Sequence, residues 1–197
     1  SDSMMRAAIQ TVCWSYGQAV ASAAKSLADA GLAPERHHVM VMDEMWQVLR
    51  ASERLVYQID AITRLNRTKG LGQIMCTHTM KDMNLSTPEL TEIARGFLER
   101  SSVKIFGGMA ENEMPLLEAV IPLSDAEKRL LGEWSAEGAV DPNSGRTLPP
   151  PGRGRFMLKL GEGNPGVPFR MNLTPSEQKV HDTNEAWAEA MAGRQDR

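Results

Sequence analysis

The feature that most constrains this chain is a short, continuous apolar run that ends on two acids. Residues 39–42 read Val-Met-Val-Met, and Asp43 and Glu44 follow directly. A run without alternation is typical of a parallel strand buried on both faces. Ligands bind at the carboxyl ends of such strands. The run therefore predicts a strand that brings two carboxylates to a binding edge, although any buried strand can also end on an exposed acid pair.

Helix and strand patterns alternate around this run. A stretch rich in Ala from about Met4 to Ala30 predicts a long helix, with Gly17 as the place where it could break. Apolar residues at helical spacing predict a second long helix from about Met45 to Lys69, which Gly70 would end.

Two further strands are expected, at Gln73–Thr77 and Val103–Phe106. Between them, a hydroxyl cap, Pro88 and Glu89 open a helix that runs to about Arg100. The alternation up to residue 106 predicts an α/β fold with a parallel sheet.

The rest of the chain reads as smaller elements. Helices are expected at 114–119 and from the capping box at 124–127 to about 134, and alternation over 156–173 predicts a β-hairpin. A final helix would open at 174–177 and carry Trp187. We divide the chain into a core part (1–134), a flexible loop rich in Gly and Pro (135–155), and a hairpin-and-helix appendage (156–197).

Composition excludes some classes of function. The net charge of −3 over 197 residues gives no global basic field for nucleic acid. No apolar stretch reaches the roughly 18 residues of a membrane span, and the first residues lack a signal-peptide pattern. Cys13 and Cys76 lie in apolar runs and are expected to be buried free thiols. We therefore expect a cytoplasmic protein, with peripheral docking at the inner face of the membrane as an option.

Several segments, in order, resemble one family. Val39–Trp46, VMVMDEMW, resembles the Walker B region of the HerA/FtsK superfamily of RecA-like P-loop ATPases, and most of all the conjugative and type IV secretion ATPases. Arg64–Gly70 resembles their basic helix end. Gln73–His78 resembles their sensor strand, which usually ends in Thr-Gln, so that His78 takes the place of the Gln. The segments 103–106, 123–127 and 154–158 are similar to the closing part of these proteins.

This resemblance implies a RecA-like core fragment with a C-terminal hairpin and helix. The intact protein would hydrolyse ATP with Mg²⁺ as a ring, expected to be a hexamer. It would energise conjugative DNA transfer or type IV-like secretion, with channel proteins as partners, DNA as a candidate cargo and no membrane insertion. The alternatives are a non-hydrolysing interaction or scaffold module of a secretion complex and an FtsK-like DNA translocase.

By the same resemblance, Asp43 would hold Mg²⁺ through water and Glu44 would be the catalytic base. Thr77 and His78 would sense the γ-phosphate, although His78 can equally be a hydrogen-bonded loop histidine.

Arg64 and Arg67 have two readings. One of them would act as an arginine finger on the nucleotide of a neighbouring subunit. Alternatively, both are cations that stabilise the end of a helix.

A phosphate-binding loop, Gly-x-x-x-x-Gly-Lys-Ser/Thr, is absent from the sequence. We therefore expect a fragment of a longer ATPase that hydrolyses no ATP by itself. In such ATPases the strand before that loop separates Gln73–Thr77 from Val103–Phe106. Without it, we expect these two strands to pair with each other or with a second chain.

Overall fold

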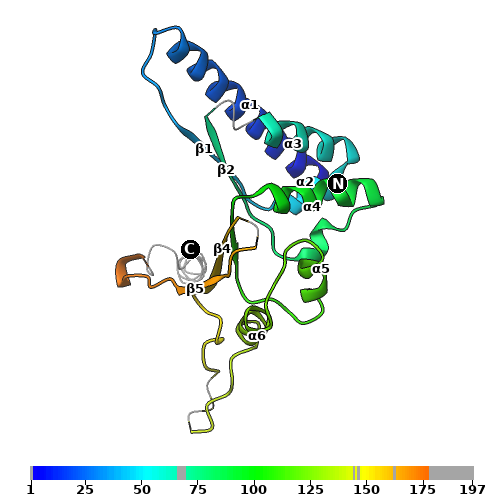
Figure 1. Cartoon of the computed structure of the whole chain (residues 1–197), viewed down its shortest axis with the longest axis vertical. Coiled ribbons are helices and arrows are strands. Elements are labelled where there is room, and N and C mark those ends of the chain that lie inside the picture. The colour runs from blue at the N-terminus through cyan, green and yellow to red at the C-terminus, as the bar shows by residue number, and fades with distance from the viewer. Residues whose placement is uncertain (1, 66–69, 144, 146, 162, 178–197) are drawn as a thin grey trace, which may run out of the picture.

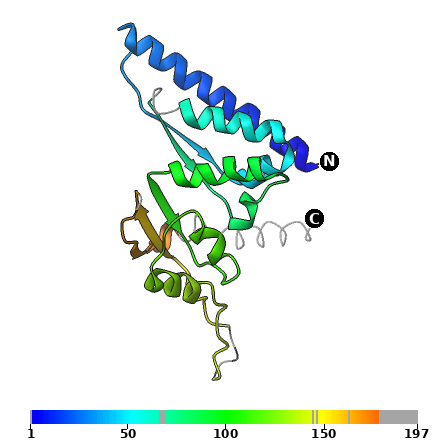
Figure 2. The ribbon, with the colours of Figure 1, turned by 45° about the vertical axis from the view of Figure 1, so that its right-hand side comes forward.

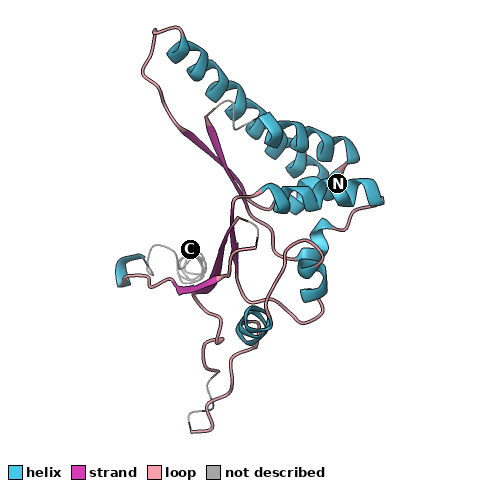
Figure 3. Ribbon diagram, in the orientation of Figure 1, coloured by secondary structure: helices cyan, strands magenta, loops and turns pink. Residues whose placement is uncertain are grey.

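The computed structural model describes residues 2–65, 70–143, 145, 147–161 and 163–177. Most of the helices lie around a first sheet in the upper part of the view, and a second sheet lies below it with shorter helices beside it (Figures 1 and 3). In both ribbon views α1 and α3 run side by side (Figure 2). The elements are α1 (Asp2–Asp29), β1 (His38–Met42), α2 (Met45–Ala51), α3 (Glu53–Leu65), β2 (Leu71–Met75), the 3₁₀ helix η2 (Met80–Met83), α4 (Pro88–Arg100), β3 (Val103–Phe106), α5 (Met114–Glu118), α6 (Asp125–Trp134), β4 (Arg155–Leu160) and β5 (Val167–Arg170).

The first sheet is a parallel pair of strands. β1 and β2 run in register from His38 opposite Leu71 to Met42 opposite Met75. The prediction of parallel strands in an α/β fold is confirmed for this pair, although β2 begins and ends two residues before the predicted Gln73–Thr77. Met40 and Met42 are buried in the first core together with residues of α1 to α4.

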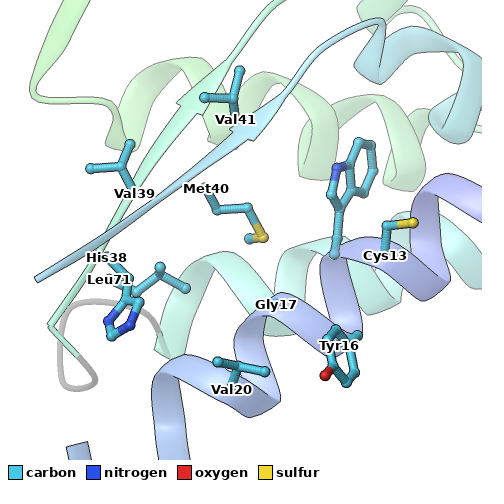
Figure 4. Close-up of a pocket in the computed structure, with 10 residues that line it drawn as sticks. Cys13, Tyr16, Gly17, Val20, His38, Val39, Met40, Val41 and Leu71 are labelled. Atoms are coloured by element: carbon cyan, nitrogen blue, oxygen red, sulfur yellow. The ribbon is translucent and has the colours of Figure 1, made fainter. Parts of the chain in front are cut away.

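The opposite face of this pair is open. Val39, Val41 and Ile74 are 66%, 55% and 51% exposed. Figure 4 shows Met40 pointing toward α1, whereas Val39 and Val41 point away from it. The prediction of burial on both faces is therefore wrong for this chain, because Met40 and Met42 share a core with residues of the helices whereas Val39 and Val41 do not.

The second sheet is antiparallel, with the strand order β3-β4-β5. The predicted hairpin is confirmed as β4 and β5. However, β3 pairs with β4 and does not continue the parallel sheet, so that part of the prediction is wrong. Within the described residues β2 pairs with β1 only, so the expected pairing of β2 with β3 is wrong as well. Pairing with a second chain stays a prediction.

Two of the predicted helices differ in continuity. α1 continues through Gly17 without a break. The predicted helix Met45–Lys69 is divided into α2 and α3, because Ser52 is extended (φ −165°, ψ 137°). The segment 66–69, at the end of that predicted helix, lies outside the described residues.

The predicted starts of two helices are confirmed by their capping residues. Thr87 caps α4, whose first residue is Pro88, and Ser124 forms a capping box with Glu127 at the start of α6. A helix begins at 175–177 as expected, and its predicted continuation with Trp187 lies outside the described residues. Both thiols are exposed, so the prediction of buried cysteines is wrong.

The described residues form two hydrophobic cores. The first joins α1, β1, α2, α3 and α4, and the second joins β3, α5, α6 and β4. The short helix η2 contributes to both, since Met83 belongs to the first core and Met80 to the second. η2 is therefore a joint between the two halves of the molecule.

A buried ion pair fastens the hairpin to α6. The Lys159 ammonium lies 2.8 Å from Glu127 Oε1, and both side chains are almost fully buried. The backbone N–H groups of Gly166 and Ser124 also donate to Glu127. Burial alone raises the pKa of this carboxyl, but the Lys159, Ser124 and Gly166 hydrogen bonds outweigh it and lower the pKa to about 2.

None of the described helices is both long and apolar enough to cross a membrane.

We predict that Lys159→Met lowers the free energy of unfolding by about 3 kcal/mol or more, because it leaves the Glu127 carboxylate buried without a cation. Urea unfolding followed by circular dichroism measures this loss. The double variant Lys159→Met, Glu127→Gln should recover part of it. Lys25→Met, which breaks the exposed pair with Asp29, is the control and should change little.

The same pair predicts an acid response. The folded pKa of Glu127 lies below its ordinary value of 4.5, so its contribution to stability is present above pH 4.5 and is lost as the pH falls toward 2. A Lys159→Met chain that unfolds at the same urea concentration as the wild type would contradict the stabilising role.

Candidate functional site

The carboxyl ends of β1 and β2 bring four predicted site residues to one edge. Because Met42 lies opposite Met75, the residues that follow each strand also meet. The Cys76 amide donates to the Met42 carbonyl (2.9 Å), and the Met45 amide donates to the Cys76 carbonyl (3.2 Å). These backbone hydrogen bonds fix the turn after β1 against the loop after β2.

Glu44 makes the turn from β1 into α2. It has a left-handed backbone conformation (φ 52°, ψ 36°), and it is the only non-glycine residue with positive φ among those described. This conformation costs about 1 kcal/mol or more for a residue with a Cβ, and such residues cluster at functional sites. The turn carries the Glu44 side chain out of the sheet and toward the loop after β2.

Three side chains bind the Glu44 carboxylate. His78 Nε2 lies 2.6 Å from Oε1, the Trp46 indole N–H donates to Oε2, and Gln47 Nε2 lies 3.5 Å from Oε2. The hydrogen bonds from His78 and then Trp46 lower the pKa of Glu44 below its ordinary value. A carboxylate oxygen can accept two hydrogen bonds, and Oε1 has only His78 as a partner among the described residues. The side chain is 31% exposed, so Glu44 can still orient a water molecule.

The His78 side chain is exposed to solvent and is hydrogen-bonded to Glu44. Its hydrogen bond to Glu44, followed by the charge of that carboxylate, raises the pKa of His78 above 6.5. Of the two readings of His78, the hydrogen-bonded loop histidine describes this structure. A role in sensing phosphate stays a prediction.

The hydroxyl of Thr77 binds Asp82 and not Glu44, although Thr77 itself is exposed. Its hydroxyl donates to Asp82 Oδ2 (3.1 Å), and the Thr79 amide donates to the same oxygen (3.2 Å). Asp82 also pairs with Arg50 (3.2 Å). Sequence reasoning missed Asp82, although Thr79 and Asp82 have the spacing of a capping box, which η2 forms.

Asp43 is the one predicted metal ligand. Its Oδ1 accepts the Glu44 amide (3.0 Å) and its carbonyl accepts the Gln10 side chain (3.3 Å). Among the described residues no group of three or more His, Cys, Asp and Glu side chains forms a metal site. Mg²⁺ is often held by one or two carboxylates with water and substrate phosphates, so a single Asp43 fits this ion. The sequence supplies no Gly-rich loop for the phosphates.

The structure does not bring Arg64 to this edge. Arg64 lies in the last turn of α3, which leads into the amino end of β2, and β1 and β2 are parallel. It pairs with Asp60 (2.6 Å), which also binds Arg100 (2.7 Å). Within one chain Arg64 is therefore a helix-end cation at the opposite edge of the sheet, and Arg67 lies outside the described residues.

A shallow hollow of about 470 Å³ lies elsewhere, between α1 and β1. Tyr16 and Val20 from α1 and Met40 from β1 line it, as Figure 4 shows. None of the described site residues contributes to it. The candidate site is therefore the open edge formed by Asp43, Glu44 and His78, and not this hollow.

Comparison with known proteins gives a likeness of fold. The chain is similar to the structure of VirB4 of Thermoanaerobacter pseudethanolicus, with a TM-score of 0.55 and 16% sequence identity. The match covers 74% of this chain and 33% of that one, so the chain spans about a third of the length of VirB4. No family model matches the chain. No curated protein matches it either.

We predict that Glu44→Gln lowers the pKa of His78 toward 6.5, because the amide removes the carboxylate that holds the imidazolium. An NMR titration of the imidazole signals, with His78 assigned from a His78→Gln chain, measures this pKa. Glu89→Gln is the control, since that carboxylate binds Tyr57 and not His78.

The sign of the pH dependence follows from both shifts. His78, with a raised pKa, contributes stability that is present below pH 6.5 and is lost as the pH rises through its folded pKa. Glu44, with a lowered pKa, contributes above pH 4.5 and loses this as the pH falls through its folded pKa. An unchanged His78 titration in the Glu44→Gln chain would show that the two side chains do not bind each other in solution.

Proposed function

We propose that this chain is part of an ATP-hydrolysing motor of the type IV secretion or conjugation class, and that it supplies the edge on which hydrolysis occurs. The observation that supports this most is the meeting of Asp43, Glu44 and the Thr77–His78 loop at the carboxyl ends of two parallel strands. Nucleotide hydrolases place the Mg²⁺ acid and the water-orienting group at such an edge. The fold likeness to VirB4 is consistent with the proposal.

Each residue has a role in this proposal. Asp43 holds Mg²⁺ through water, and the metal supplies charge neutralisation for the phosphates. Glu44 accepts a hydrogen bond from the attacking water and orients it. His78 holds the Glu44 carboxylate in place, and Thr77 anchors the loop that carries His78. A phosphate-binding loop elsewhere in a longer protein would supply the cradle that this sequence lacks.

The assembly and its cargo belong to the same proposal. A ring of subunits, expected to be a hexamer, would act with channel proteins at the inner face of the membrane. Arg64 or Arg67 would reach the nucleotide of a neighbour, which fits the position of Arg64 at the edge of the sheet away from Glu44 of its own chain. An FtsK-like DNA translocase is the alternative within the ATPase class.

One observation favours a second class of function, a non-hydrolysing interaction module. Both Glu44 oxygens already accept hydrogen bonds, and the pKa of the carboxyl is lowered, which makes it a weaker base. In that reading the Glu44–His78 pair only fastens one loop to another. Turnover by the Glu44 variant separates the two functions.

We predict that, in a protein carrying this segment together with a phosphate-binding loop, Glu44→Gln lowers the ATP turnover rate by about 100-fold or more and leaves ATP binding intact. The amide keeps the shape of the side chain but does not accept a proton. Asp43→Ala should weaken Mg²⁺-dependent binding as well. Phosphate release and binding of a fluorescent nucleotide measure the two effects.

Glu99→Gln, which alters an exposed acid of α4, is the matched control and should turn over normally. Normal turnover of the Glu44→Gln protein would contradict the proposed role of Glu44 and favour the interaction module.

The arginines generate a separate prediction. An Arg64→Ala, Arg67→Ala protein should be inactive alone and should regain part of its activity when mixed with the Glu44→Gln protein. A mixed ring contains some interfaces with an intact finger and an intact base. If the double variant alone turns over at the wild-type rate, the two arginines are helix-end charges and nothing more.

A further inference from the structure

The short helix η2 lies where the two cores meet, directly after the loop that carries Thr77 and His78. Met83 packs in the first core and Met80 in the second. Because both ends of η2 are anchored, a polar side chain on this turn has a fixed position relative to the β1 and β2 tips. Asp82 is that side chain.

Asp82 is a buried carboxylate whose oxygens face two different elements. Oδ2 accepts the hydroxyl of Thr77 and the amide of Thr79, one on each side of His78. Oδ1 faces the guanidinium of Arg50 on α2 (3.2 Å), which also donates to the Lys81 carbonyl. Only 7% of Asp82 is exposed, so its charge depends on these donors for the solvation that water would otherwise give.

The same α2 helix carries the other half of the arrangement. Trp46, one turn before Arg50, donates its indole N–H to Glu44, and the Arg50 guanidinium lies over the Trp46 ring at 6.0 Å. One connected set of contacts therefore runs from Glu44 through Trp46 and Arg50 to Asp82. It returns from Asp82 through the loop to His78 and Glu44.

We propose that Asp82 is a positioning residue for Glu44: by binding the loop on both sides of His78 and α2 through Arg50, it holds His78 in reach of the Glu44 carboxylate. Asp82 is the acceptor of both the Thr77 hydroxyl and the Thr79 amide. Without it the loop keeps its backbone hydrogen bonds at Cys76 and at the Thr79 carbonyl, but the stretch between them loses the contacts on either side of His78, and the exposed His78 ring would leave Glu44. The use of this arrangement in catalysis rests on the proposed function, whereas the arrangement itself does not.

The test measures the geometry in this chain by NMR. In the wild type, a nuclear Overhauser effect should connect the His78 ring with the Glu44 side chain, and the Trp46 indole N–H, assigned from a Trp46→Phe chain, should show a hydrogen-bonded shift. Asp82→Ala and Asp82→Leu should abolish the His78–Glu44 effect and move the Trp46 signal toward that of a free indole. Exchange of the Thr79 amide should become about fivefold faster.

Asp82→Asn tests rescue, because it keeps one oxygen for the loop while losing the charge that faces Arg50. We expect it to retain the His78–Glu44 effect in part. The Leu variant keeps the buried volume, so the comparison of Leu with Asn stands even if the Ala chain fails to fold.

Asp60→Ala is the matched control. Asp60 is also a mostly buried carboxylate with two arginine partners, but it lies on α3 away from this loop. It should lower thermal stability and leave the Trp46 and His78 signals unchanged. The proposal is overturned if Asp82→Leu keeps the His78–Glu44 effect, if Asn behaves no better than Leu, or if Asp60→Ala alters the two signals equally. No step of this test uses ATP. A finding that Glu44 has no role in ATP turnover would therefore contradict the proposed function and leave the positioning role of Asp82 unaffected.

Discussion

The parallel pairing of β1 with β2 is the constraint on which the candidate site depends. Five residues pair in register, so both strands end at the same level. Strands that slipped by one residue would exchange their buried and exposed faces and would also separate Glu44 from His78. Burial of Met40 and Met42 against the helices fixes the register, and the register in turn fixes which side chains meet at the edge.

The turn at Glu44 places side chains of α2 at the edge that this pairing forms. A left-handed residue at the end of β1 lets α2 begin at once, and α2 then brings Trp46 and Arg50 back over the edge. The strained residue is held by contacts that over-determine it, which include the Met45 amide on Cys76 and the His78 ring on the carboxylate. The site is therefore preorganised by neighbours on two elements that are not adjacent in sequence.

The short helix η2, where the two cores meet, also supports the site. η2 belongs to both cores, and Asp82 on η2 binds the loop that reaches Glu44. The second core, where the Glu127–Lys159 pair ties the hairpin to α6, therefore adjoins the turn that holds this loop. The two sheets do not pair with each other within the described residues, so η2 and α4 carry much of the connection between the halves.

The sequence by itself determined the local elements. β1, the capped starts of α4 and α6, and the hairpin were predictable, because apolar runs, caps and alternation act within a few residues. It also singled out Asp43, Glu44, Thr77 and His78 as candidate site residues, and the parallel pairing of β1 with β2 brings the segments that carry them to one edge.

Only the tertiary structure decided the open face at Val39 and Val41, the break at Ser52, the pairing of β3 with β4, the separation of Arg64 from the edge and the role of Asp82. Apart from the break at Ser52, each depends on contacts between distant segments, which the pattern of residues along one segment does not encode.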